Sequence, residues 1–158
     1  PRYQSILASQ IPVIDLPENK GQVRIIAGKF GEATGPAHTF TPIDVWDLRL
    51  TSDQFIDLAV PDGYNTLLAV LKGSVCVHNS ETINTAEVGL FDRIGDHIRI
   101  SSESDTIALL LGGEPIDEPI VGSGPFVMNT AEEIRQAKID YQSGNMGKIS
   151  QTQRYRLL

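Results

Sequence analysis

Residues 45–77 read VWDLRLTSDQFIDLAVPDGYNTLLAVLKGSVCV. Apolar side chains alternate with polar ones from 46 to 50 and again from 56 to 60, the two-residue period of a strand with one buried face. Pro61-Asp62-Gly63 predicts a turn, and Leu67–Leu71 is almost wholly apolar, as in a strand covered on both sides. Gly73 then separates this run from a further strand at 74–78. The whole segment therefore predicts four short strands in succession.

Strand-like segments of the same kind lie on both sides of this region. We expect further strands at residues 22–27, 88–91, 97–101 and 106–111. Roughly eight or more short strands, spaced about ten residues apart, indicate an all-β sandwich or barrel. A jelly roll is one such fold, and periodicity alone does not separate it from an immunoglobulin-like sandwich.

The C-terminal part of the chain has a helical pattern. Thr130 followed by Glu133 forms a capping box, in which each side chain satisfies a free backbone N–H. An apolar stripe begins at Ile134 and continues with helical spacing, and Gly144 is suitably placed to end the helix. We expect a helix at about 131–143, the one helix that the sequence predicts.

Composition narrows the functional classes. The chain has 158 residues, of which 41% are hydrophobic, and this suits one domain with a packed core. With 13 basic and 20 acidic residues the net charge is -7, so direct binding to nucleic acid is not expected. No apolar run approaches the roughly 20 residues that span a bilayer, so no membrane partner is expected. With no signal peptide visible, we expect a cytoplasmic protein.

Residues 118–130 read EPIVGSGPFVMNT and are followed by AEEIRQAKIDYQSGNMG. This run resembles the end of pirin-family proteins, and the matching motif residues are Gly124, Pro125, Phe126, Asn129 and Thr130. The stretches PRYQSILASQIPVI, IIAGKFGEATGP, LKGSVCV and ALLLGGEPIDEP also resemble the C-terminal cupin domain of that family, in the same order. The resemblance covers nearly all of residues 1–149.

The resemblance implies a fold and an activity for the parent protein. Family members have two cupin β-sandwiches in tandem, and iron or another divalent metal sits in the N-terminal one. They are associated with quercetin 2,3-dioxygenase activity and, in animals, with transcriptional co-regulation. This chain would be the second cupin: a cupin-like sandwich at 1–122, a linker and helix of the same domain at 123–149, and a tail at 150–158. The chain begins at Pro1 without Met, so we expect that it has been processed or trimmed, or that it is a part of something longer.

The chain departs from the cupin metal motifs. The first motif of such sites is His-x-His followed by a Glu that lies seven residues before a Gly, and the second is Pro-x-Gly-x-x-His. Together these imidazoles and the carboxylate bind iron and leave coordination positions open for oxygen and substrate. Aligned on Gly73, the carboxylate position falls on Thr66, and the two His positions fall on 59 and 61 or on 60 and 62. Aligned on Gly95, the second motif places Ile98 at the His position. Histidine and glutamate are missing from all of these positions.

His97 lies one residue from the His position of the second motif. A shift of one residue in a strand turns the side chain to the opposite face, so His97 remains only a weak candidate ligand. His38 and His78 are expected to be exposed. No nucleophile elbow or phosphate loop is present. We therefore expect no catalytic or cofactor-binding residue, and no cofactor, in this domain.

Three functions remain open. The first is a non-catalytic, metal-free module that braces the parent's N-terminal metal-bearing cupin, or pairs with a second copy as a homodimer, with other protein partners possible. The second is a part of a metal-dependent quercetin 2,3-dioxygenase, for which the warrant is family resemblance alone. The third is a barrel that binds a small ligand, with room near Ala59, Thr66 and Ala69.

Overall fold

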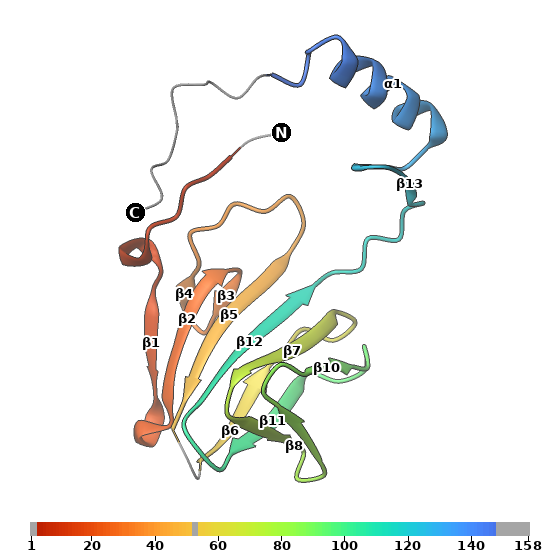
Figure 1. Ribbon diagram of the computed structural model, residues 1–158. Coiled ribbons are helices and arrows are strands. Elements are labelled where there is room, and N and C mark those ends of the chain that lie inside the picture. Colours follow the sequence, from red (N-terminus) through yellow and green to blue (C-terminus); the bar gives the residue numbers. More distant parts are fainter. Residues whose placement is uncertain (1–2, 52–53, 148–158) are drawn as a thin grey trace. The chain divides into compact units, whose positions relative to one another are not determined.

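The computed structural model describes residues 3–51 and 54–147 (Figure 1). The tail expected at 150–158 lies outside the described residues. The chain divides between Pro115 and Ile116 into two compact units, which are described separately below.

Unit 1 contains two antiparallel sheets. The larger has six strands in the order β1-β2-β5-β12-β7-β10 (Figure 1). Their bounds are β1 Val13–Leu16, β2 Gly21–Ala27, β5 Ile43–Leu50, β7 Asn65–Lys72, β10 Val88–Phe91 and β12 Thr106–Gly113. The smaller has four strands in the order β6-β11-β8-β9. These are β6 Gln54–Ala59, β8 Ser74–Val77, β9 Glu81–Asn84 and β11 His97–Ser102.

Short elements complete unit 1. A two-stranded ribbon pairs β3 Lys29–Phe30 with β4 Ala33–Thr34, and two 3-10 turns, η1 Ala8–Gln10 and η2 Pro17–Asn19, flank β1.

Side chains from both sheets meet in one hydrophobic core. Leu48, Leu68 and Leu110 face inward from the larger sheet, Leu58 and Ile100 face inward from the smaller one, and each is at most 1% exposed. Each such Leu or Ile contributes about 1.5–3 kcal/mol when fully buried. The predicted β-sandwich is therefore confirmed, and the alternating residues of 46–50 and 56–58 do place one face in the core.

The structure also contains strands that the sequence pattern did not predict. β1 is short, and β9 buries only Ile83. The segment Gly122–Pro125, interpreted from the sequence as a link, is instead part of a hairpin in unit 2. There β13 Val121–Ser123 pairs with β14 Phe126–Met128 through the two residues Gly124 and Pro125. Gly124 has φ +58, which suits a turn with glycine at its first central position.

The hairpin of unit 2 packs against the single α-helix among the described residues, α1 Ala131–Gln142. Phe126 meets Tyr141 edge-to-face at 5.9 Å between ring centroids. Thr130 and Glu133 form the predicted capping box. Asn129 donates through its amide to the Glu118 carboxylate (2.9 Å) and to the Pro119 carbonyl (3.0 Å). All five motif residues, Gly124, Pro125, Phe126, Asn129 and Thr130, thus lie in this hairpin or at the start of this helix.

Candidate functional site

Four of the residues at the cupin ligand positions, Val60, Pro61, Thr66 and Ile98, line one cavity of unit 1, whereas Ala59 and Asp62 do not line it. Thr66 of β7 and Ile98 of β11 are both 3% exposed, and Val60 lies beside them. Pro61, the alternative His position, lines the same cavity, whose volume is about 470 Å³. Four of the aligned positions therefore lie close together in the sandwich, and their side chains are one hydroxyl and three apolar groups.

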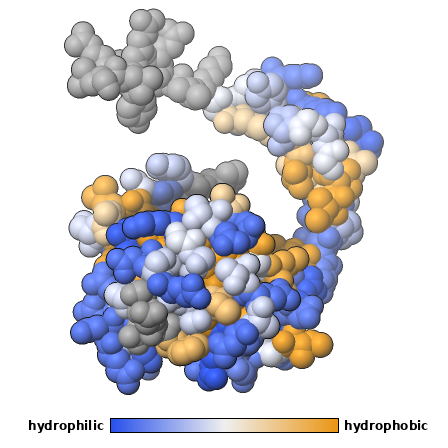
Figure 2. Space-filling view, turned by 60° about the horizontal axis from the view of Figure 1, so that its bottom comes forward, coloured by the Kyte–Doolittle hydropathy of each residue, from blue (hydrophilic) through white to orange (hydrophobic). Residues whose placement is uncertain are grey.

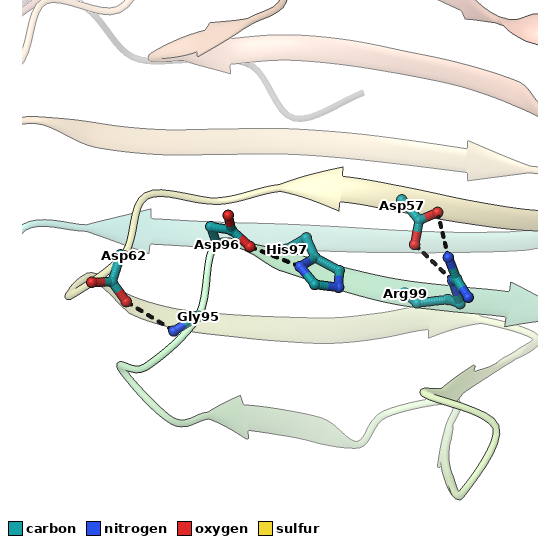
Figure 3. Close-up of polar contacts among 6 residues, drawn as sticks. All are labelled: Asp57, Asp62, Gly95, Asp96, His97 and Arg99. Carbon is teal, nitrogen blue, oxygen red and sulfur yellow. Dashed lines mark hydrogen bonds and ion pairs between the residues drawn. The ribbon is translucent and has the colours of Figure 1, made fainter.

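One wall of this cavity is held together by hydrogen bonds between two loops. The loop after β6 and the loop before β11 join where the Gly63 N–H donates to the Arg93 carbonyl (2.7 Å) and the Val60 N–H donates to the Asp96 carbonyl (2.9 Å). The Gly95 N–H donates to Asp62 Oδ1 (2.8 Å), as Figure 3 shows. This wall is therefore braced by backbone as well as by side chains.

His97 lies at the rim of the cavity, at the start of β11. It is exposed, and its neighbour Ile98 is buried, so the predicted orientation of these two side chains is confirmed. Its Nδ1 is 2.8 Å from Asp96 Oδ1 (Figure 3). This hydrogen bond holds the pKa of Asp96 below its ordinary value. Because a carboxylate can only accept a hydrogen bond, Nδ1 of His97 carries the proton. In the neutral ring, Nε2 is then unprotonated and can accept a hydrogen bond.

His78 faces His97 from another part of the chain. The two rings meet edge-to-face with 6.4 Å between their centroids. His78 and Asn79 form the turn between β8 and β9 with φ of 48° and 59°, a left-handed conformation that few residues other than glycine adopt. His78 is exposed, as predicted, but its approach to His97 was not foreseen, because only the pairing of β8 with β11 brings the two segments together.

The cavity does not fit the family's metal ion. Thr66 and Ile98, with Val60 or Pro61, supply one hydroxyl where two or three imidazoles and a carboxylate would be needed. Within residues 3–51 and 54–147, no group of three or more His, Cys, Asp or Glu side chains is arranged to hold a metal ion. His38 lies on the surface and does not line this cavity.

A second cavity of about 550 Å³ shares Val60, Pro61 and Tyr64 with the first. Asp44 lines it, and burial raises the pKa of this carboxyl, against the opposing effect of the hydrogen bond that it accepts from the Lys29 N–H. The pKa of Tyr64 is raised by burial and by the negative charges of Glu114 and Asp44. The sequence pattern predicts no site here, since these residues come together only through the loops that flank β5 and β7.

Comparison with known proteins covers most of the chain. A family model described as the pirin C-terminal cupin domain matches residues 45–147. A Pseudomonas aeruginosa protein named "Putative quercetin 2,3-dioxygenase PA2418" is 42% identical over 144 residues, which are 91% of this chain and 50% of that protein. Pirin-1 of Arabidopsis thaliana is 33% identical over 153 residues, which are 93% of this chain and 52% of that protein.

A solved structure agrees with these sequence relatives. The crystal structure of a protein named quercetin 2,3-dioxygenase from Acinetobacter baumannii superposes with a TM-score of 0.87 at 42% identity, over 94% of this chain and 52% of that one. The chain thus spans about half the length of the relatives it matches. In the part of the chain that the structure describes, no helix is long and apolar enough to cross a membrane.

Proposed function

Because the chain belongs to the pirin family and holds its C-terminal cupin domain, we propose that it is a non-catalytic, metal-free module that packs against a second cupin. In the parent protein that second cupin is the N-terminal domain, with iron or another divalent metal bound there. A chain without this domain pairs instead with a second copy of itself, as a homodimer.

The observation that carries this proposal is the outer face of the six-stranded sheet. On β7, β10 and β12, most of the side chains that point away from the core are apolar, with exposed Asn65 and Lys72 at the two ends of β7 as exceptions. The apolar ones are Leu67, Ala69, Leu71, Val88, Leu90, Ile107, Leu109 and Leu111. Leu71 is 59% exposed, Val88 60% and Leu90 78%. Contiguous exposed apolar surface of this kind marks interaction sites. We call these eight residues the apolar sheet face.

The outer face of the smaller sheet has a different character. There Asp57 of β6 pairs with Arg99 of β11, with the two side chains about half exposed (Figure 3). His97 and Ser101 lie on the same face as Arg99. Figure 2 shows hydrophobic groups, in orange, exposed among hydrophilic ones on the side that it presents. A charged face loses hydration when it is buried, so the apolar sheet face is the better docking surface of the two.

The chemistry of the first cavity supports the metal-free part of the proposal. Thr66 and Ile98 stand at the positions of a carboxylate and an imidazole, so the metal of the family would have to be bound by another domain. Elemental analysis after incubation with ferrous iron tests this directly. Stoichiometric retention of iron by this chain would contradict the proposal.

The docking role is tested by charge substitution on the apolar sheet face. Analytical ultracentrifugation of the chain should show a dimer, and the double variant L71E/V88E should be a folded monomer. Phe55→Glu is the matched control, because Phe55 is 54% exposed on the outer face of the smaller sheet. A clean monomer of the unmodified chain that also fails to bind a separately expressed N-terminal cupin would overturn the proposal.

A second candidate function is that of part of a quercetin 2,3-dioxygenase. Its support is the activity named for the Pseudomonas aeruginosa relative and for the Acinetobacter baumannii protein of known structure. Under this alternative, the chain would turn over quercetin only together with a metal-bearing domain, and its removal would abolish the activity of the pair. Turnover by the iron-loaded chain alone would instead favour an enzyme and contradict the non-catalytic role.

A further inference from the structure

One edge of the six-stranded sheet lacks the features that usually protect a free edge strand. Such strands are shielded by charged residues or by proline. β1, at the opposite edge, lies between Pro12 and Pro17. In the smaller sheet, the edge strand β6 carries Asp57 and the edge strand β9 carries Glu81. β10 reads Val-Gly-Leu-Phe and has neither kind of residue, so its free side can accept a further strand.

The backbone of β10 leaves two residues available for such a strand. The Val70 N–H of β7 donates to the Glu87 carbonyl (3.1 Å), directly before β10. Because bonded pairs alternate along an antiparallel ladder, Gly89 also bonds towards β7. Val88 and Leu90 therefore direct their N–H and C=O groups to the free side. Within residues 3–51 and 54–147, no other strand pairs with β10.

The cavity of about 470 Å³ reaches this free side of β10. Leu90 points away from the core and Gly89 points towards Ile83 of β9, yet Leu90 and Gly89 both line the cavity. A cavity that is lined from both faces of an edge strand extends around the edge of that strand. Glu81 of β9 lines it as well. The cavity therefore adjoins the edges of both sheets.

The charged groups of the cavity favour a positively charged side chain. Glu81 and Asp92 are exposed, and among the described residues neither carboxylate has a hydrogen-bond or ion-pair partner. Arg93 also lines the cavity, but its Nε–H donates to Asn65 Oδ1 (2.7 Å). Two unpaired carboxylates thus outweigh one engaged guanidinium, and a Lys or Arg side chain would gain charge-assisted hydrogen bonds here.

Strand pairing would bring such a side chain to the cavity. Residues directly opposite each other in an antiparallel pair carry their side chains on the same face. A peptide residue opposite Gly89 therefore points to the cavity side, where the glycine itself has no side chain. The two residues opposite Val88 and Leu90 lie beside apolar side chains that are 60% and 78% exposed. The matching peptide is apolar, basic and apolar in turn.

We propose that the free edge of β10 and the adjoining cavity bind an extended peptide segment of a partner protein. The segment adds to β10 as an antiparallel strand and places one Lys or Arg side chain in the cavity, where Glu81 and Asp92 bind it. Backbone bonds then supply affinity and the cavity supplies specificity. The site does not depend on the docking role proposed above, because it uses the backbone of β10 and the cavity rather than the rest of the apolar sheet face.

A proton–nitrogen NMR titration of the full chain with capped peptides tests this proposal. The first peptide is Ser-Thr-Val-Arg-Val-Thr-Ser, and two others replace its arginine by glutamine or by glutamate. We expect the arginine peptide to bind about fivefold more tightly than the glutamine peptide, as for an exposed ion pair, and to shift the amide signals of Val88 and Leu90. The glutamate peptide should bind most weakly. Equal affinities, shifts confined to other strands, or no binding at millimolar peptide would overturn the proposal.

N-methylated forms of the arginine peptide test the strand pairing itself. A methyl group on the nitrogen of the first valine removes an N–H that donates to β10, so it should weaken binding about tenfold. A methyl group on the arginine nitrogen is the control, because that N–H points away from β10 in the same pairing. Equal losses from the two methyl groups would contradict the addition of a strand.

Variants of the chain assign the charge preference to residues. E81Q/D92N removes both carboxylates and keeps their size, so the arginine and glutamine peptides should then bind equally. E103Q/D105N is the matched control, because it removes the same charge from exposed residues that do not line the cavity. It should keep the preference of about fivefold. A preference that survives E81Q/D92N, with the fold intact by circular dichroism, would contradict the role of the two carboxylates.

Discussion

Gly73 joins β7 to β8 at a position where a side chain has no room. Its φ is +79, and a Cβ placed there would lie 2.4 Å from Thr106 Oγ1 and 3.0 Å from the Asp105 carbonyl oxygen. Thr106 cannot move aside easily, because it is 1% exposed and its hydroxyl lies within hydrogen-bond distance of the Ser74 and Ser104 carbonyls. The glycine on which the first metal motif aligns therefore has a structural reason to be there.

Gly73→Ala should lower the free energy of unfolding by about 3–4 kcal/mol, the sum of left-handed strain and steric overlap. Gly63→Ala is the matched control: Gly63 has φ +85, but the space around it is open. That change should cost only about 1–2 kcal/mol. Urea denaturation of both variants checks the difference, and equal losses would contradict the steric argument.

Asp57 and Arg99 form an exposed pair with two hydrogen bonds, of 2.8 and 3.0 Å. The hydrogen bond from Arg99 holds the pKa of Asp57 below its ordinary value. A carboxyl whose pKa is lowered by folding stabilises the fold above its unfolded pKa, and this contribution is lost as the pH falls through the folded pKa. Arg99→Gln should therefore raise the pKa of Asp57 towards that of a free aspartate.

Carbon NMR of the Asp57 carboxyl group over an acid titration measures this shift. Arg49→Gln serves as a control, because Arg49 lies on the other sheet and is paired with Asp47 instead. Since both members of the Asp57–Arg99 pair are exposed, the variant should change the thermal midpoint only slightly. An Asp57 pKa that does not respond to Arg99→Gln would show that another charge sets it.

Individual elements differ in how far their sequence predicts them. The helix was predicted within one residue at its end, because the capping box, the apolar stripe and Gly144 are all local signals. β9 was missed, since its residues ETIN contain one apolar side chain, and its strand character comes from pairing with β8. The hairpin at 121–128 was missed because glycine and proline are typical both of tight turns and of irregular linkers.

The helix of unit 2 depends on its N-terminal cap. Thr130 Oγ1 accepts from the Glu133 N–H (3.2 Å), and Glu133 Oε2 accepts from the Thr130 N–H (2.9 Å). Thr130→Ala should lower the opening free energy of the helix by about 1 kcal/mol, seen as faster amide hydrogen exchange in its first turns. Thr130→Ser keeps the hydroxyl and should exchange almost as slowly as the parent chain. Equal acceleration in both variants would argue against the cap.

For the molecule as a whole, the sequence predicted which residues occupy the cupin ligand positions, but it did not predict which side chains surround them in space. The position of Thr66 and the inward orientation of Ile98 followed from motif alignment and strand parity. The approach of His78 to His97 did not, because their contact depends on the register of β8 against β11 and on a left-handed turn. Likewise, the apolar sheet face combines three strands that are distant in sequence and adjacent only in the sheet order β12-β7-β10.

Because the chain has a net charge of -7, the salt dependence of self-association tests whether two copies pair through the apolar sheet face. Two copies with this charge repel each other at low ionic strength, while burial of the apolar sheet face does not depend on attraction between charges. The dimer dissociation constant should therefore fall as sodium chloride is raised, by several-fold between low and physiological ionic strength. Sedimentation equilibrium over a salt series measures it, with Phe55→Glu as a variant whose added charge should steepen the dependence. A dimer that weakens with salt would be held by ion pairs, and the apolar sheet face could not then be its interface.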